Sequence, residues 1–431
     1  MHRYLLLSTF FLFFVLSAEG QNYVEKQNRH RFAQLTLGLD YQVGLGMAQS
    51  FYATENQLTP FDLDPIGRGR FLLGGTHFWG HADFYIAIPL WNGSQQTDFA
   101  QVFQTPGVET VFKYYPWRIQ RKRVAPYVGI GLTPFGFRQD ALEMGELSSK
   151  GAFITRIRYP MYMGLTALFG NHLLELGAVW NYDNDVNYFI SANQSIGINM
   201  HPWNVSFGYK YMLDTTQGAE RSWDNGNVAI VTERKKKDGS LNDFFIGFGL
   251  SSAWFLRQSD YLEENYPWID DHKIAAPFPD VVFGYLWNPP DIHLNAVFRT
   301  YRSSLSAHGT VQRLQRQSLG LEAIKSLGDY HGFVPFIGPV VSYEWVNGSL
   351  TEGEQMIWDE SQGSFQAGVT FGWDIRPTHL DWFFLRTNLR YFPAFDFKLD
   401  AESIIPLDQI EFNFIQMVVY FNRAVENFKR E

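Results

Sequence analysis

Acidic and basic residues recur at alternate positions of apolar stretches, and these charges are the first candidates for chemistry. Asp40 stands in Gln34–Gly46, where every odd position is apolar and every even position is polar or glycine. Successive side chains leave a strand on opposite faces, so a period of two gathers such charges on one face. The residues predicted to share this polar face are Asp40, Glu109, Lys113, Arg156, Arg158, Glu175, Lys210, Arg299, Glu322, Glu344, Asp374, Arg386 and Arg390.

Charges of both signs on one enclosed face allow two interpretations. In a water-filled space they would create a transverse field and select among ions. In a filled space they would pair with one another as structural ion networks. The mixture of signs favours neither cations nor anions, and bulky residues on the same face, such as Tyr127, Leu286 and Phe384, would favour the filled interior.

Two histidines and an acidic loop are the candidates for metal binding. His77 and His81 stand four residues apart, a spacing that suits zinc on a helix, but here it crosses the end of a strand into a turn. Turn histidines are therefore the prediction. The loop 255–278 carries acidic residues that are predicted to be solvated rather than to bind divalent cations. They are Asp260, Glu263, Glu264, Asp270 and Asp271.

Enzyme motifs are missing from the sequence. There is no Gly-x-Ser-x-Gly elbow, no Ser–His pair on one strand and no glycine-rich phosphate loop. The chain has no cysteine, which excludes thiol chemistry and disulfides. We therefore expect no catalytic activity, no metal and no cofactor.

The stretch Gln34–Gly46 also indicates where such strands lie. It is longer than an ordinary strand of about 5–6 residues and suits a tilted transmembrane strand, which needs about 9–11. Its odd residues would face lipid and its even residues a polar interior. Aromatic residues make up 17% of the chain, which suits aromatic girdles at the two membrane interfaces, and the mean hydropathy of −0.19 excludes a helical membrane protein.

The first twenty residues predict a cleaved signal peptide. His2 and Arg3 precede an apolar run, Tyr4–Leu16, and Ala18-Glu19-Gly20 supplies small residues for cleavage before Gln21. The net charge of −9 argues against a nucleic-acid partner.

Strands and turns then alternate along residues 21–431, which predicts one all-β domain. Short turns are expected at Gly80-His81, Trp117–Arg123, Gly170-Asn171, His201-Pro202, Lys235–Gly239, Asn288–Pro290, Gly328-Asp329 and Pro377-Thr378. Counting the strands between them, including one over Asn227–Glu233, gives a transmembrane antiparallel up-and-down barrel of about 18 strands. Counts of 14 or 16 also fit.

Two segments of the chain are similar in sequence. Gly107-Val108-Glu109, followed by Pro126-Tyr127-Val128-Gly129, is similar to Gly320-Leu321-Glu322, followed by Pro335-Phe336-Ile337-Gly338. Either a shared hairpin pattern or a duplication explains this similarity.

Two late strands carry a family resemblance. Trp382–Tyr391 and Phe412–Gln416 resemble the C-terminal strands of outer-membrane β-barrel proteins of the porin-like kind. Many members end on an aromatic residue that the barrel-assembly machinery reads, whereas here a charged tail, Asn422–Glu431, follows. The resemblance is architectural and implies export to the cell outer membrane of a Gram-negative bacterium, in contact with lipid and lipopolysaccharide.

The resulting functional expectation is a passive channel for small hydrophilic solutes, as a monomer or homo-trimer. One alternative is a non-conducting barrel that serves an assembly, secretion or adhesion complex. Another is a transporter of hydrophobic substrates with about 14 strands. A water-soluble β-sandwich is disfavoured, because soluble strands are shorter and carry fewer outward aromatics.

Overall fold

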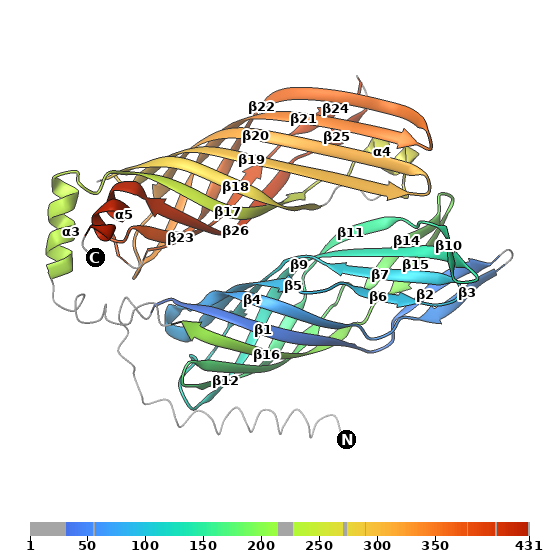
Figure 1. The fold of residues 1–431 in the computed structure, drawn as a ribbon, viewed down its shortest axis with the longest axis horizontal. Coiled ribbons are helices and arrows are strands. Elements are labelled where there is room, and N and C mark those ends of the chain that lie inside the picture. The colour runs from blue at the N-terminus through green and yellow to red at the C-terminus, as the bar shows by residue number, and fades with distance from the viewer. Residues whose placement is uncertain are drawn as a thin grey trace.

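The chain forms two closed antiparallel β-barrels of eight strands each. The computed structural model describes residues 32–54, 57–213, 227–269, 274–288, 290–376, 378–400 and 403–429. Within these residues each barrel is an up-and-down meander, in which strands adjacent along the chain are also neighbours in the sheet. Figure 1 shows the barrels side by side, the first in blue and green and the second in yellow to red.

The first barrel closes where β1 pairs with β16. Leu39 is the register partner of Tyr209, and on the other side of β1 it is the partner of Phe71. Its strands are β1 (Gln34–Leu45), β4 (Gly67–His77), β5 (Ala82–Pro89), β8 (Glu109–Tyr114), β9 (Val124–Glu143), β12 (Met161–Phe169), β13 (His172–Trp180) and β16 (Trp203–Leu213).

The second barrel closes where β17 pairs with β26. Phe248 is the register partner of Met417. Its strands are β17 (Asp243–Phe255), β18 (Ile274–Trp287), β19 (Ile292–Ala307), β20 (Thr310–Ser326), β21 (Phe333–Glu352), β22 (Gln355–Ile375), β23 (Phe383–Phe392) and β26 (Gln409–Tyr420).

Smaller elements lie at the two ends of the barrels. The additional strands are β2 (Gln49–Thr54), β3 (Gln57–Asp62), β6 (Gly93–Gln96), β7 (Ala100–Pro106), β10 (Glu146–Ser149), β11 (Phe153–Arg158), β14 (Asp185–Ser191), β15 (Gln194–Asn199), β24 (Asp396–Lys398) and β25 (Ile404–Pro406). The helices are η3 (Phe78–Gly80), α3 (Asn227–Lys237), α4 (Asp260–Asn265) and α5 (Phe421–Phe428).

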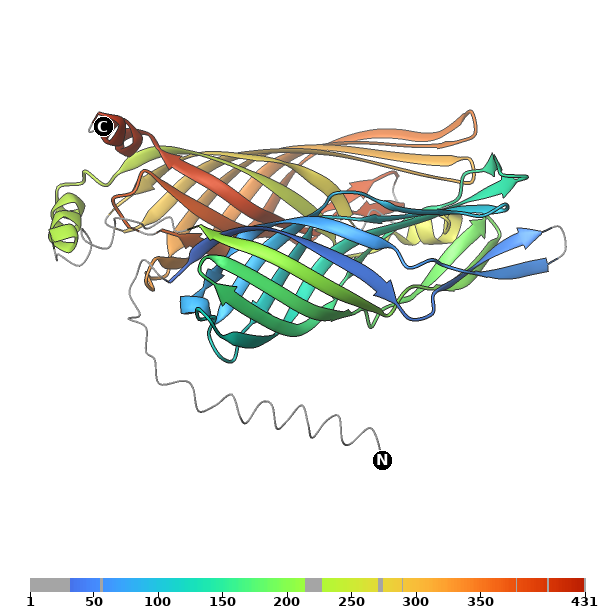
Figure 2. The same cartoon turned by 60° about the horizontal axis from the view of Figure 1, so that its bottom comes forward.

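Both barrels point the same way. At one end, here called the turn end, lie the short connections of both barrels, together with α3 and α5 (Figures 1 and 2). At the opposite end, the loop end, lie the four-stranded sheet β14-β15-β2-β3, the strands β6, β7, β10 and β11, and the β24–β25 hairpin. The connections of the first barrel are longer at the loop end, but in the second barrel two of the loop-end connections are tight turns, at His308-Gly309 between β19 and β20 and at Gly353-Glu354 between β21 and β22.

Apolar side chains join the barrels along their length. In the middle, Ile86 of β5 packs with Phe412 and Phe414 of β26, and the Phe84 ring lies edge-on to Trp373 at 5.5 Å. At the turn end, the Trp79 ring lies 5.0 Å from that of His331.

The loop end joins the barrels a third time. One apolar cluster there includes Phe137 and Ile198 of the first half of the chain and Leu305 and Leu350 of the second. Apolar and aromatic contacts at the turn end, in the middle and at the loop end therefore hold the two barrels against each other.

The predicted single barrel of about 18 strands is wrong, and so is the count of 14; the count of 16 matches the total of the two eight-stranded barrels but not one closed barrel. Strand pairing closes twice, because β16 returns to β1 before β17 begins. Alternation along a strand fixes which face is apolar, but it does not specify which strand is the neighbour. The boundary therefore leaves no mark in the alternation pattern.

Two local predictions also need correction. The strand expected over Asn227–Glu233 is part of helix α3, which continues through Lys235–Lys237, so the expected turn is confined to the residues from Asp238 onward. His201-Pro202 is not a short turn at the turn end. It joins β15 to β16 at the loop end, where β14 and β15 form a hairpin of their own.

The two similar segments of the sequence form equivalent hairpins in the two barrels. β8 and β9 are the fourth and fifth strands of the first barrel, and β20 and β21 are the fourth and fifth of the second. Glu109 and Glu322 are both buried in their barrels, whereas Lys113 is buried and Lys325 is exposed. The equivalence favours duplication of an eight-stranded unit over a shared hairpin pattern.

The helices of the described residues are short. None of them is long and apolar enough to cross a membrane.

Candidate functional site

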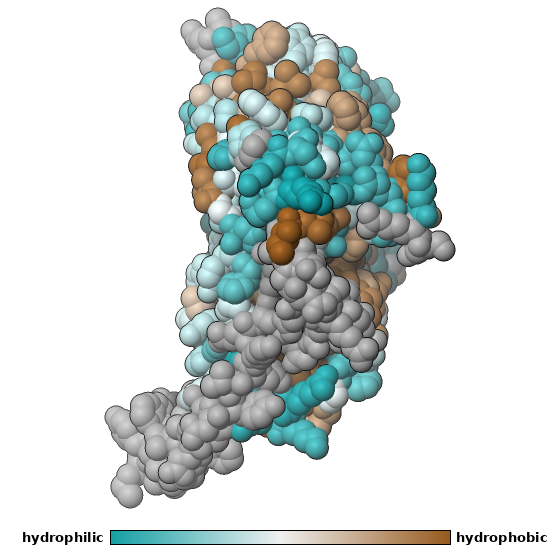
Figure 3. Space-filling model, turned by 90° about the vertical axis from the view of Figure 1, so that its left-hand side faces the viewer, coloured by the Kyte–Doolittle hydropathy of each residue, from teal (hydrophilic) through white to brown (hydrophobic). Residues whose placement is uncertain are grey.

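The barrel walls reverse the burial pattern of a soluble protein. On β16, Phe207 is 57% exposed and faces outward, while Lys210 is fully buried and faces the interior. The same alternation continues on β22, where Phe365 and Phe371 are exposed and Asp374 is buried. Hydrophobic residues show on the flank of the second barrel in Figure 3, and hydrophilic residues gather over the turn end. An apolar exterior around a charged interior characterises membrane barrels.

An ion-paired group occupies the first barrel near its loop end. Arg70 of β4 donates from Nε to Oδ1 of Asp40 on β1 at 2.8 Å, and its Nη1 pairs with Glu109 of β8. Tyr162 of β12 donates its hydroxyl to Glu109 Oε1 at 2.6 Å. Four strands are thereby connected across the interior.

A second group lies nearer the turn end of the same barrel. Lys113 donates to Glu175 Oε2 at 2.8 Å, and Lys210 pairs with both Asp83 and Glu175. The Lys113 ammonium also lies 4.2 Å from the centroid of the Tyr127 ring. Because each ammonium has a carboxylate and an aromatic face, its charge is compensated inside the barrel.

The second barrel has a group that spans its full width. Arg390 of β23 donates from Nη1 to Asp280 Oδ2 of β18 at 2.6 Å and from Nε to Glu322 of β20. Asn413 and Ser251 also donate to Asp280 Oδ2, each at 2.9 Å. These partners lie on opposite sides of the barrel, so their contacts fill its centre.

Two further groups extend this network toward the ends. Toward the loop end, Arg316 donates to Glu344 Oε2 at 2.6 Å, and Arg299 pairs with Glu411. Toward the turn end, Asp374 accepts from two guanidinium groups. Arg386 reaches it from Nε at 2.7 Å and Arg376 from Nη2 at 2.6 Å.

Most residues predicted for the polar face are thus buried in ion pairs. The exceptions are Arg156 and Arg158 on β11. Arg156 is half-buried, and neither residue forms an ion pair with any other described residue.

Sequence reasoning missed several members of the networks. They are Arg70, Asp83, Asp280, Arg316, Arg376 and Glu411. Asp280 and Arg316 stand one residue before the alternating stretches Val281–Trp287 and Gln317–Lys325, over which the sequence predicts strands. Extending the alternation outward from those strand ends would have found both.

Apolar side chains fill the rest of the second barrel. Phe397 and Ile405 of the β24–β25 hairpin pack onto Tyr301 and Leu314 at the loop end. At the turn end, Phe384, Leu286 and neighbouring apolar residues form another buried cluster.

The first barrel is filled in its turn-end half by a cluster that includes Tyr85, Tyr115 and Tyr127. Bulky inward residues therefore occupy both barrels, which supports the filled interpretation.

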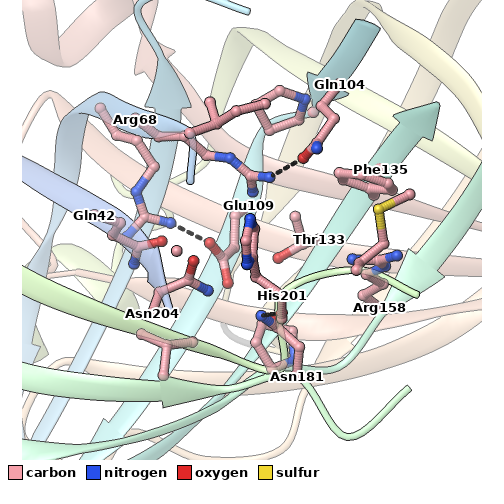
Figure 4. A pocket seen from close by; sticks show the side chains of 18 of the residues that line it. Gln42, Arg68, Gln104, Glu109, Thr133, Phe135, Arg158, Asn181, His201 and Asn204 are labelled. Atoms are coloured by element: carbon pink, nitrogen blue, oxygen red, sulfur yellow. Dashed lines mark hydrogen bonds and ion pairs between the residues drawn. The ribbon is translucent and has the colours of Figure 1, made fainter. Parts of the chain in front are cut away.

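A cavity of about 40 Å³ remains in the loop-end half of the first barrel (Figure 4). Its lining includes Arg68, Arg70, Glu109, Phe135 and Arg158. A buried water needs roughly 10–15 Å³ measured in this way, so there is room for about three.

The candidate metal ligands do not assemble. His77 Nδ1 lies 2.9 Å from Gly75 O, and His81 Nδ1 lies 3.0 Å from Tyr115 O. Asp260 and Glu263 lie in the first turn of α4, Glu264 follows them, and Asp270 and Asp271 fall outside the described residues. No three His, Asp or Glu side chains in the described part of the chain are placed to hold a metal ion.

Comparison with known proteins gives architecture alone. No protein-family model and no curated protein matches the chain. Solved structures with some similarity include Neisserial surface protein A, at 17% identity, covering 41% of this chain and 96% of that one, with a TM-score of 0.28. Ail of Yersinia pestis is 13% identical and covers 42% of this chain and 96% of that one, with a TM-score of 0.26. An outer membrane channel of Pseudomonas putida F1 is 9% identical and covers 93% of this chain and 98% of that one, with a TM-score of 0.22.

TM-scores this low do not by themselves establish a shared fold. The closed antiparallel barrels, apolar outside and charged inside, carry the conclusion. The chain has the architecture of outer-membrane β-barrel proteins, and the resemblance stated from the sequence is confirmed at this level.

Proposed function

We propose that this protein is a non-conducting outer-membrane protein whose two barrels together support a rigid recognition surface outside the cell. Its barrels serve as membrane anchors rather than as pores. This is the adhesion or complex-forming alternative among the functions considered from the sequence.

Placement in the membrane is supported by the outward side chains. Leu165, Leu176 and Phe207 on neighbouring strands of the first barrel are each about half exposed, although burying a leucine or phenylalanine side chain stabilises a protein by roughly 1.5–3 kcal/mol. Phe248, Phe283 and other residues repeat this on the second barrel. A hydrocarbon environment accounts for such a surface, because lipid tails replace water around it.

The absence of conduction is the central element of the proposal, and it is carried by Arg390. This guanidinium is fully buried between Asp280 and Glu322, which lie on separate strands across the barrel. Barrels of about eight strands have interiors just wide enough for side chains to fill. The passive channel expected from the sequence has weaker support, because apolar clusters close the second barrel on both sides of this network.

The recognition surface is supported by strands that extend beyond the bilayer. β21 has 20 residues and β22 has 21, whereas a tilted transmembrane strand needs about 9–11. The surplus lies at the loop end, where one apolar cluster joins both halves of the chain. Since both barrels hold this end, it offers a partner a large surface that is already ordered.

Orientation is inferred from the amount of structure at each end, because the loop end carries the additional strands even though two of its connections in the second barrel are two-residue turns. Barrels of this class have short turns on the periplasmic side and longer loops outside the cell. The turn end would then face the periplasm, and α3 with its basic last turn would lie on that side.

Planar-bilayer recording tests the proposal. The purified full-length protein is predicted to insert without opening discrete channels, while a general porin conducts in the same bilayers. Insertion is checked separately by protease protection of vesicles prepared with the same protein. Reproducible single-channel steps from inserted protein would overturn the proposal and restore the passive channel.

A further inference from the structure

The two barrels differ in how completely their internal charges are matched. In the second barrel each buried guanidinium has a carboxylate partner. The partners form the pairs Arg299–Glu411, Arg316–Glu344, Arg376–Asp374, Arg386–Asp374 and Arg390–Asp280. In the first barrel, Arg70, Lys113 and Lys210 are paired in the same way. Three arginines of the first barrel, the buried Arg158 and the half-buried Arg68 and Arg156, have no ion pair with another described residue, and of these Arg68 and Arg158 line the cavity.

Of these residues, Arg158 has the highest energetic cost of burial. It is only 7% solvent-accessible, and its Nε and Nη2 have no hydrogen-bond partner among the described residues. Its contact is with the face of Phe135, whose centroid lies 3.9 Å from the guanidinium carbon. A cation–π contact contributes about 2 kcal/mol when desolvated, whereas an isolated buried charge costs several kcal/mol.

Arg68 approaches the same ring from another strand. Its guanidinium carbon lies 5.6 Å from the Phe135 centroid, and its Nη2 donates to Gln104 Oε1 at 2.9 Å. Gln104 is neutral, so it satisfies a hydrogen bond without compensating the charge. Figure 4 shows Arg68 and Arg158 on different sides of this cavity.

Two other polar side-chain atoms around the cavity also lack hydrogen-bond partners. Gln42 Nε2 is a donor without an acceptor among the described residues, and the Thr133 hydroxyl is unpaired as well. Both residues line the cavity. Water could accept these hydrogen bonds, but a neutral water molecule would leave Arg68 and Arg158 without a direct ionic partner among the described residues, since Glu109 attracts Arg68 and Asp183 attracts Arg158 only from beyond ion-pair distance.

We infer that this cavity is a binding site for a small oxyanion of the phosphate or sulfate type, held between Arg158 and Arg68. Guanidinium groups bind such anions through paired N–H donors, and burial strengthens the attraction. The volume suits one tetrahedral anion. The anion is either free in solution or carried by a sugar or lipid headgroup whose remainder stays outside the barrel.

Thermal unfolding of the full-length protein in detergent tests the inference. Sodium phosphate is titrated against sodium chloride at matched ionic strength, and glucose 6-phosphate is titrated in a parallel series. Saturable stabilisation by inorganic phosphate supports a free anion. Saturable stabilisation by the sugar phosphate alone supports an anion carried on a larger molecule.

Substitutions assign the effect to the cavity. Arg158→Gln and Arg68→Gln are each predicted to weaken phosphate binding by about tenfold or more, since each removes a charged hydrogen-bond donor. Arg156→Gln is the matched control, because Arg156 lies on the same strand but does not line the cavity. It should bind phosphate within about threefold of the wild type.

The inference is overturned if neither anion stabilises the protein in a saturable way. It is also overturned if Arg158→Gln and Arg68→Gln respond to phosphate as the wild type does. Should either variant fail to refold, Arg158→Lys retains the charge and is predicted to bind phosphate more weakly than the wild type but measurably.

Discussion

The Arg390 guanidinium on β23 donates to the Asp280 carboxylate on β18 across the interior of the second barrel, at 2.6 Å. Neither strand is a neighbour of the other in the sheet. The contact therefore connects opposite walls and occupies the position where a conducting barrel would hold water. Both side chains are fully buried.

Breaking this pair should destabilise the protein strongly. Arg390→Ala leaves the Asp280 and Glu322 carboxylates buried without their partner, and losing one member of a buried pair costs about 3–5 kcal/mol. Urea unfolding of the detergent-refolded protein measures the change. Arg313→Ala is the control, because Arg313 is exposed at the loop end of β20 and should change stability by less than about 0.5 kcal/mol. Equal effects of the two substitutions would argue against a structural network.

A charge placed on the predicted lipid face should be costly only within the bilayer. Leu165 lies in the middle of β12 and is 47% exposed, while Leu147 on β10 lies at the loop end and is 54% exposed. Leu165→Arg is predicted to destabilise the protein in lipid vesicles by about 2–4 kcal/mol, and Leu147→Arg by less than about 1 kcal/mol. A soluble barrel would tolerate both substitutions alike.

Epitope insertion tests which end lies outside the cell. Gly353 in the β21–β22 connection and Gly239 after α3 both have positive φ and stand in turns at opposite ends of the second barrel. An epitope inserted at Gly353 should bind antibody on intact cells. The same epitope at Gly239 should bind only after the outer membrane is permeabilised, and the reverse result would invert the orientation.

Acid should weaken the contact between two turns at the turn end. Burial would raise the pKa of Asp291, but the Arg376 guanidinium, 3.0 Å away, outweighs it and lowers the pKa below the ordinary value of 3.8. A carboxyl group whose pKa is lowered by folding stabilises the protein above its unfolded pKa. That contribution is lost as the pH falls below about 3.8 and through the folded-state pKa.

Asp291→Asn removes this titration while preserving the backbone. Asn tolerates the positive φ of 51° found at residue 291. The stability difference between wild type and variant should therefore be largest near neutral pH and shrink on acidification below pH 3.8. A difference that is constant with pH would contradict the assignment. Urea unfolding across a pH series provides the measurement.

The sequence predicts the walls of these barrels better than their closure. The alternation in Gln34–Gly46 correctly separates Leu39, which is outside, from Asp40, which is inside, and Gly170-Asn171 correctly predicts a hairpin. The pairing of β1 with β16 depends on which strand ends meet in space, and no local pattern encodes this. α3 was missed because its start, Asn227-Val228-Ala229-Ile230-Val231-Thr232, is rich in β-branched residues.

The candidate site could be predicted only in part, because its residues come from several strands. Arg158 was assigned to the polar face by its alternation with Ile157, but nothing near it in the sequence shows that its charge is uncompensated. Its neighbours Arg68 and Phe135 come from other strands, and only the closed barrel brings the three together. Whether a buried guanidinium group has an ionic partner therefore depends on the tertiary structure.

Cysteine cross-linking tests the two-barrel architecture most directly, since the chain has no cysteine of its own. Leu39→Cys with Tyr209→Cys should cross-link the first barrel, and Phe248→Cys with Met417→Cys the second, because each pair occupies facing register positions. A denaturing gel detects each cross-link as a shift in mobility that reducing agent reverses. The double variant with Leu39→Cys and Met417→Cys should remain uncross-linked. Efficient cross-linking of that last pair, with none in the other two, would show one large barrel closed by its first and last strands and would contradict the account.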